Sequence, residues 1–361
     1  FRRFPNRHET GIMPSFGSRL KPYFMNLHRF FFLCLTACIS IHAAAADYLQ
    51  GRLNNGLRYH ILPTGEHNGR LAVQLQVEVG AADEENGEEG MAHMVEHINF
   101  RSSPAYPQGI ASQLSARSWQ MGRHFNAQTT YDYTRYLLLP PRGNRELEDS
   151  LTIAAEILRP RQFKPSDWQI EQKTVLNEWR NRQNAENRLT LKRNAPLLRG
   201  SRHGRYPPIG GETAIRTAEA GQLSRFHNKW YAPNNAVILI TGDIDPQTVQ
   251  RELTKRLGDL QRITLPARCG IECEPPLQNG WRSATVQDAE NGDSSLDLVF
   301  RFRNPSSRRA DSEGEYQRLL DNFAAYIIES RLKKQTLPPV ILSLSLHSGN
   351  LARQTGSVSI S

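Results

Sequence analysis

Two histidines and a glutamate lie within five positions of an otherwise apolar stretch, and this pattern restricts the fold more than any other feature of the chain. In GMAHMVEHINF, His93, Glu96 and His97 occupy positions i, i+3 and i+4, so an α-helix places their side chains on one face. The surrounding residues are mostly apolar, which predicts a buried helix. Charged groups on a buried helix require partners, and a metal ion would provide them.

The spacing of these three residues fits a particular chemistry. Two imidazoles one helical turn apart can bind the same zinc ion, with a third ligand from another element. A carboxylate beside the site can take a proton from a water molecule whose pKa the metal lowers. The order H-x-x-E-H is the reverse of H-E-x-x-H and serves the same reaction. A solvated surface helix is an alternative for such a short motif, but the apolar neighbours favour a metal site.

A third ligand is expected from the segment SDWQIEQKTVLNEWRN, which is predicted to form a helix. Glu171 and Glu178 lie seven residues apart, nearly two turns, so both carboxylates face the same side. They are about 10 Å apart along the helix axis, too far for both to bind one ion. One of them is expected to bind the metal and the other to support the site, and the spacing does not say which.

The remaining segments mix strands and helices without a regular β-α-β repeat. The Asn-Gly pair in LNNGLRYHIL predicts a hairpin, and residues 70–80 and 125–140 are each predicted to form a strand. A buried strand is predicted over residues 234–245, and the helical segments are interrupted near Pro160 and Pro165. This mixture predicts an α+β fold with a mixed or antiparallel sheet and packed helices.

Composition divides the chain into successive segments. Residues 47–263 are predicted to form a first module, and residues 264–292, which are rich in Pro and Gly, a linker. Residues 293–361 are predicted to be the start of a second module that is incomplete. Within the linker, Cys269 and Cys273 are expected to close a small disulfide loop in an oxidising compartment.

The N-terminal region is typical of an exported protein. Residues 25–46 begin at a methionine and contain basic residues, an apolar run and a group of alanines, which is the order of a signal peptide. Residues 1–24 precede this methionine and are expected to play no part in the working protein. The stretch LTAC resembles a lipoprotein box, so attachment to a membrane is expected only if Cys38 is lipidated. We therefore predict export, with the periplasm as the destination.

The formal net charge of +9 does not indicate a nucleic-acid-binding protein. Residues 1–46 carry a net charge of +5, which leaves +4 for all the residues after them. No motif for RNA or DNA binding accompanies this charge, so nucleic acid is not expected as a partner.

At these motifs the chain resembles the pitrilysin/insulinase family of zinc metallopeptidases, which includes the mitochondrial processing peptidases. The resemblance rests on the inverted motif in GMAHMVEHINF, on EQKTVLNE with its two glutamates, and on FNAQTTYDYTRY. It also includes the opening NNGLRYHILP and the closing KWYAPNNAVILITGDID. These segments follow one another from about residue 47 to residue 260, in the order of a complete first module.

The resemblance implies a role for each residue of the motifs. His93, His97 and Glu178 would be the ligands of one zinc ion per chain, and Glu96 would be the general base that activates a zinc-bound water. Glu171 would be the supporting carboxylate, hydrogen-bonded near the site and not bound to the metal.

The family also binds its substrate along an edge strand, to which Asn126 and Ala127 correspond. An extended peptide would add to that edge through main-chain hydrogen bonds, a mode that tolerates many sequences. Four more residues of the segment fit the same pattern: Thr129, Asp132, Thr134 and Tyr136. They are expected to be structural, because threonines and tyrosines in strands are usually packing residues.

The chain also departs from the family pattern. Family members close the cleft with a second half that supplies an Arg/Tyr pair, and no position here matches that pair. The opposite half is therefore expected from a longer chain or from a partner chain. Met91 and the pair Arg101–Ser102 differ from the commonest family residues, and we expect neither difference to touch the chemistry.

These observations favour a zinc-dependent endopeptidase that is exported and hydrolyses extended or unfolded peptides. The alternative is a non-catalytic peptide-binding scaffold of the same family, inactive without a second half. A zinc hydrolase of another amide shares the chemistry, but the edge-strand motif disfavours it.

Overall fold

The structure, a computed structural model, describes residues 48–361 except the single positions 206, 291, 293, 307, 308, 310, 337 and 340. The predicted signal peptide at residues 25–46, the segment 1–24 and the candidate lipidation site Cys38 lie outside the described residues. Within the described part, no helix is both long enough and sufficiently apolar to cross a membrane.

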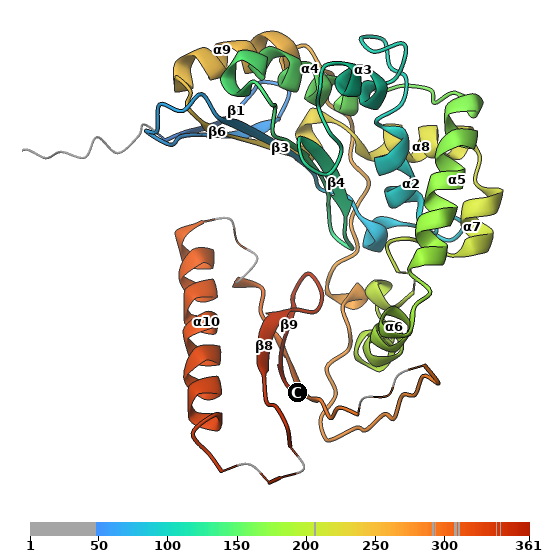
Figure 1. The fold of residues 1–361 in the computed structure, drawn as a ribbon, viewed down its shortest axis with the longest axis vertical. Coiled ribbons are helices and arrows are strands. Elements are labelled where there is room, and N and C mark those ends of the chain that lie inside the picture. Colours follow the sequence, from blue (N-terminus) through green and yellow to red (C-terminus); the bar gives the residue numbers. More distant parts are fainter. Residues whose placement is uncertain are drawn as a thin grey trace, which may run out of the picture. The chain divides into compact units, whose positions relative to one another are not determined.

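A six-stranded sheet forms the centre of the first part of the chain (Figure 1). Its order is β1-β2-β6-β3-β5-β4; β2 and β6 run parallel, and the other described neighbours run antiparallel. The predicted Asn-Gly hairpin joins β1 to β2, and the predicted α+β fold with a mixed sheet is confirmed. The strands are β1 (Leu49–Arg52), β2 (Arg58–Pro63), β3 (Leu71–Val77), β4 (Phe125–Thr129), β5 (Thr134–Leu138) and β6 (Ala236–Gly242).

Burial alternates along the central strands of this sheet. In β3 and in β6, buried residues alternate with partly exposed ones along the whole strand. Because successive side chains of a strand point to opposite faces, each strand contributes one row of apolar side chains to the core. Helices α4 (Leu147–Leu158) and α9 (Pro246–Leu257) pack against each other and over the sheet, and their apolar residues complete that core (Figure 1).

The remaining helices of this part include the two that carry the metal-binding motifs. Helix α2 packs against α5, α8 and β4, so the H-x-x-E-H segment and the pair of glutamates lie side by side (Figure 1). Pro165 begins α5, a position where the missing N–H of proline does no harm. The helices are α2 (Met91–Ile98), α3 (Ile110–Ala116), α5 (Pro165–Asn181), α6 (Ala185–Leu198), α7 (Glu212–Thr217) and α8 (Ala220–Trp230).

Helix α2 begins at a position that suits only glycine. Gly90 has a φ of 79°, and a Cβ added there would lie 2.7 Å from the Cα of Gly210. The carboxyl group of Glu84 accepts hydrogen bonds from the amides of Gly90 and Ala92, both at 2.9 Å, at the end of the helix where amides lack partners. These contacts set where the helix starts, and therefore the direction in which its two histidines project.

Residues 125–140 form a hairpin, and our prediction of a single strand is wrong. The amide of Thr130 donates to the carbonyl of Tyr133 at 2.9 Å, and its hydroxyl accepts from the amide of Tyr133 at 3.2 Å. Threonine and tyrosine favour strands throughout this run, but the side-chain hydrogen bonds of Thr130 stabilise a turn at residues 130–133. The hairpin places β4 beyond β5, as one of the two edge strands of the sheet.

The linker predicted at residues 264–292 contains a short 3-10 helix (Ile271–Cys273) and no other helix or strand at its described positions. Cys269 and Cys273 are joined by a disulfide, as predicted.

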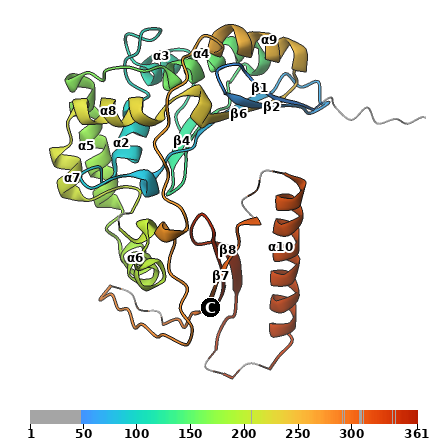
Figure 2. The ribbon, with the colours of Figure 1, turned by 180° about the vertical axis from the view of Figure 1, so that it is seen from behind.

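A second, antiparallel sheet follows with the order β7-β9-β8, and helix α10 packs against β8 (Figure 2). These elements are β7 (Leu298–Arg303), α10 (Ser312–Leu332), β8 (Leu346–Asn350) and β9 (Thr355–Ile360).

Candidate metal centre

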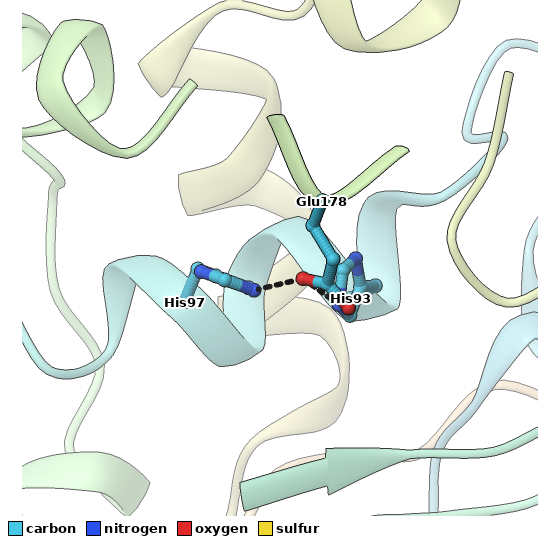
Figure 3. A group of neighbouring side chains, drawn as sticks. All are labelled: His93, His97 and Glu178. Atoms are coloured by element: carbon cyan, nitrogen blue, oxygen red, sulfur yellow. Dashed lines mark ion pairs between the residues drawn. The ribbon is translucent and has the colours of Figure 1, made fainter. Parts of the chain in front are cut away.

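Two imidazoles of helix α2 point toward one carboxyl oxygen. Nε2 of His93 lies 3.5 Å from Oε2 of Glu178, and Nε2 of His97 lies 3.3 Å from the same oxygen (Figure 3). Glu178 belongs to α5, so two helices bring the three side chains together. The three ligand atoms lie within 4.8 Å of one another, and no other group of this kind occurs among the described residues.

The donor set and its spacing fit a tetrahedral zinc ion. Nitrogen and oxygen ligands bind zinc at about 2.0–2.1 Å, so the ligand atoms of a tetrahedral site stand about 3.4 Å apart. The separations of 3.5 Å and 3.3 Å between the imidazole nitrogens and Glu178 agree with that spacing. Three protein ligands would leave a fourth position open, which is the arrangement of catalytic zinc sites.

Glu171 contacts the other ring nitrogen of His97. Its Oε2 lies 3.2 Å from Nδ1, and its Oε1 accepts from Nε and Nη2 of Arg101, each at 2.5 Å. A carboxylate in this place sets the tautomer and the orientation of a ligating histidine. We expected Arg101 not to touch the chemistry, but Arg101, three residues after the end of α2, contacts the carboxyl group that contacts His97.

Arg182 holds the candidate ligand Glu178 in a similar way. Nη2 of Arg182 donates to Oε1 of Glu178 at 2.5 Å, from one turn further along the same chain segment. Oε2 of Glu178 is then the oxygen that faces the two histidines. We did not predict this contact from the sequence, although the i, i+4 spacing of a glutamate and an arginine is a signal for it.

These contacts set the protonation of the metal-free site. Burial lowers the pKa of His93 to about 3, so its ring is neutral at pH 7. Burial by itself lowers the pKa of His97, but hydrogen bonds to Glu171 and Glu178 outweigh it and raise the pKa to about 9. The hydrogen bond from His97 lowers the pKa of Glu178 to about 2. His97 therefore carries a proton at pH 7, which it would have to release in order to bind a metal ion through Nε2.

Glu96 lies between the two histidines on α2 and is 8% exposed. Burial raises the pKa of Glu96 to about 7, and a 2.5 Å hydrogen bond from the hydroxyl of Thr129 acts in the opposite direction. A carboxyl group with a pKa near neutral can both accept and return a proton at pH 7. Thr129, which we expected to be a packing residue, thus contacts the motif directly.

Asn126 and Ala127 lie in β4, at the edge of the six-stranded sheet. The amide of Thr130 bonds inward to Tyr133, so the main-chain groups of Ala127 and Thr129 point away from β5. The outward amide of Ala127 donates to Oδ1 of Asn126 at 3.0 Å. This edge therefore has main-chain groups that the sheet itself does not use.

The site is arranged as in zinc-dependent hydrolases. Two imidazoles of α2 and a carboxylate of α5 stand at the spacing of zinc ligands, and α2 also carries a buried carboxyl group. Comparison with known proteins narrows this class. Residues 62–205 match the insulinase domain of peptidase family M16, and residues 217–337 match the peptidase M16 inactive domain. The chain belongs to the M16 (insulinase/pitrilysin) family, as its motifs predict.

Relatives of this chain are named as zinc proteases and processing peptidases. The probable zinc protease PqqL of Haemophilus influenzae is 30% identical over 309 residues, which cover 83% of this chain and 33% of that protein. The chloroplastic stromal processing peptidase of Arabidopsis thaliana is 32% identical over 201 residues, covering 54% of this chain and 15% of that protein. The chain thus spans about a third or less of the length of these relatives.

Solved structures share the fold. The first half of the periplasmic protease PqqL from Escherichia coli matches with a TM-score of 0.78 at 25% identity, covering 87% of this chain and 67% of that chain. The ferredoxin protease FusC, solved in complex with Arabidopsis ferredoxin, matches with a TM-score of 0.77 at 31% identity, covering 87% and 35%. These neighbours are proteases with repeated modules, and the predicted architecture is confirmed.

Proposed function

We propose that this chain is the catalytic half of a zinc-dependent endopeptidase that hydrolyses extended or unfolded peptides. The observation that carries the proposal is the meeting of His93, His97 and Glu178 at the spacing of zinc ligands, with Glu96 buried on the same helix. The zinc proteases among the relatives support the binding of one zinc ion per chain.

Each side chain of the site has one task in this proposal. Bound zinc would supply a Lewis acid that polarises the scissile carbonyl and acidifies a water molecule. His93, His97 and Glu178 would hold the ion, and Glu171 orients His97 through Nδ1. Glu96 accepts the proton of the attacking water and returns it to the leaving amine, for which a pKa of about 7 is suitable.

We infer that the substrate binds along β4. An extended peptide can pair with the outward main-chain groups of Ala127 and Thr129, once the side chain of Asn126 leaves the amide of Ala127. Such pairing recognises the backbone and tolerates many sequences, which suits extended or unfolded peptides. The description of the structural neighbour FusC as a ferredoxin protease supports a polypeptide as the substrate class.

We further infer that a second peptidase half, in a longer chain or in a partner chain, provides the opposite wall of the cleft. The chain covers 33% of PqqL from Haemophilus influenzae, and no Arg/Tyr pair for the scissile carbonyl is matched in its sequence. We also infer export to the periplasm, which the signal-like residues 25–46 and the periplasmic PqqL of Escherichia coli support.

The decisive test is hydrolysis of an unstructured peptide by the 361-residue chain, with Glu96→Gln as the matched control. The substitution preserves size and removes the base, so the rate is expected to fall by about 10²–10⁴-fold while zinc remains bound. Equal hydrolysis by both proteins would contradict the role of Glu96. If neither protein hydrolyses the peptide, adding a candidate second half to both shows whether catalysis requires it.

A second candidate function is peptide binding without catalysis. Residues 217–337 match a domain described as inactive, which favours a scaffold role. This alternative predicts that the wild-type chain and Glu96→Gln bind the peptide equally well, and that neither hydrolyses it even with a second half present.

A further inference from the structure

Thr129, the last residue of β4, makes a direct hydrogen bond to the carboxyl group of Glu96. Its hydroxyl donates to Oε2 of Glu96 over 2.5 Å, between residues 33 positions apart in the sequence. Glu96 is 8% exposed, so water has little access to the carboxyl group. The contact joins the strand proposed to bind the peptide to the helix that carries the proposed base.

The hydroxyl of Thr129 has a second polar neighbour on β5, and the two distances decide which group accepts its proton. Thr129 is paired with Thr134 of β5, and their hydroxyl oxygens are 3.4 Å apart. Thr134 is fully buried, and its hydroxyl donates to the carbonyl of Val79 over 2.9 Å. A hydroxyl has one proton to donate, so Thr134 has none left for Thr129. The oxygen of Thr134 can still accept, but it lies 3.4 Å from the hydroxyl of Thr129, against 2.5 Å for Oε2 of Glu96, so the proton of Thr129 is directed to Glu96.

We infer that Thr129 is a positioning residue: its hydroxyl holds Oε2 of Glu96 and leaves Oε1 to face the reacting water and the leaving amine. The inference rests on the proposed peptidase function. Within the described part of the chain, the carboxyl group of Glu96 makes this hydrogen bond through Oε2 and none through Oε1.

The physical reason is the freedom of a glutamate side chain. Several torsions place its carboxyl group, and a displacement of about 1 Å from the productive position costs about 100-fold in rate. A hydrogen bond from β4 fixes the base relative to that strand, and therefore relative to a peptide paired with the strand. A threonine that only packs would do so through its methyl group, which valine also has.

Three variants of the 361-residue chain separate positioning from packing. Thr129→Val keeps the shape and removes the donor, and we expect kcat to fall about 10–100-fold with KM and zinc content unchanged. Thr129→Ser keeps the donor and should restore most of the rate. Thr134→Val is the matched control, because it removes a buried hydroxyl that does not bond Glu96; it should lower the unfolding temperature and leave kcat nearly intact.

Coupling to Glu96 gives a second readout. On the Glu96→Gln background, Thr129→Val should cause no further loss of the residual rate, because the hydroxyl acts through the carboxylate. A purely structural role would lower that residual rate by the same factor again. The inference is overturned if Thr129→Val keeps kcat within about twofold of wild type, or if Thr134→Val causes an equal loss.

Crystal structures of the wild type and of Thr129→Val supply a readout independent of activity. We expect the carboxyl group of Glu96 to leave its place beside residue 129 in the variant, while His93, His97 and Glu178 stay in place. An unmoved Glu96 overturns the inference even if neither protein hydrolyses peptide. The two proposals can fail separately. If Glu96 is displaced in Thr129→Val, the contact positions Glu96. If the zinc-loaded wild type is nevertheless inactive with a second half present, the proposed function is refuted and the positioning contact is not.

Discussion

His97 meets a carboxylate at each ring nitrogen, with Glu171 at Nδ1 and Glu178 at Nε2. Arg101 balances the charge of Glu171, and Arg182 balances that of Glu178. The ring therefore holds a proton above neutral pH, and a metal ion bound at Nε2 would have to take the place of that proton. Glu171 contacts the opposite ring nitrogen, so the proposed zinc ion and Glu171 would not compete for the same atom.

Zinc binding near pH 7 is expected to release about one proton per ion, because the pKa of metal-free His97 is about 9. Below pH 9 the zinc ion competes with the proton on His97. Zinc affinity should therefore rise about tenfold for each pH unit up to pH 9, and it should change little above pH 9. Calorimetric titration in buffers of different ionisation enthalpy counts the released protons. A heat of binding that is the same in every buffer would contradict the prediction.

Glu171→Gln is the matched variant for this measurement. It removes one of the three carboxylates, Glu171, Glu178 and Glu96, that raise the pKa of His97, so fewer protons should be released. It should also weaken zinc binding by about 10–100-fold, because the ring loses the group that orients it. Identical proton release by both proteins would show that Glu171 does not set the charge of His97.

At the scale of elements, the site depends on where α2 begins and on how α5 and β4 pack against it. Gly90 and Glu84 set the first turn of α2, and the side chains of the metal motif follow from it by helical spacing. α5 then supplies Glu171 and Glu178, and β4 supplies Thr129. A displacement of any one of these elements therefore changes the centre as a whole.

Gly90→Ala is expected to destabilise the protein by about 1–3 kcal/mol and to weaken zinc binding. A Cβ at this position would lie 2.7 Å from the Cα of Gly210 and 3.0 Å from the carbonyl oxygen of Ile209, and both neighbours are backbone atoms. Denaturant unfolding measures the loss of stability.

Gly122→Ala is the matched control, because Gly122 has a φ of 81° but no heavy atom within 4 Å of an added Cβ. It should lose only the cost of the left-handed backbone, about 1–2 kcal/mol, and keep its zinc affinity. If the two variants lost stability equally and bound zinc equally, close packing at Gly90 would have no role in the site.

At the scale of the whole molecule, the described part of the chain leaves an apolar stripe of α10 exposed. Its members recur every three or four residues, so they lie on one side of the helix. Phe323 is 62% exposed and Tyr326 is 67% exposed. The stripe consists of Tyr316, Leu319, Phe323, Tyr326 and Ile327. Contiguous apolar surface of this kind favours association with another apolar surface.

We therefore expect the chain to self-associate as its concentration rises, and Phe323→Lys to reduce that association. Asn322→Lys places the same charge on the neighbouring exposed position outside the stripe, and it should leave association unchanged. Sedimentation velocity over a range of concentrations distinguishes the two variants. If the two variants self-associate to the same degree, the association takes place through a surface other than the stripe.

Local patterns predicted the elements because helix and strand periods are set by a few consecutive residues. The i, i+3, i+4 spacing placed His93, Glu96 and His97 on one helix face, and the structure has them on α2. Alternation predicted β3, and prolines marked the breaks between helices. The same local signals failed at residues 125–140, where strand propensity hid a turn that depends on the side-chain hydrogen bonds of Thr130.

By itself, the sequence determined the motif, the two candidate glutamates, the fold class and the family. Only the tertiary structure brought Glu178 to the two histidines, placed Glu171 and Arg101 behind His97, and directed Thr129 at Glu96. These contacts join residues 33 to 85 positions apart, and helical or strand periods say nothing at that distance. They depend on the strand order and on the packing of α5 and β4 against α2, which the whole core decides together.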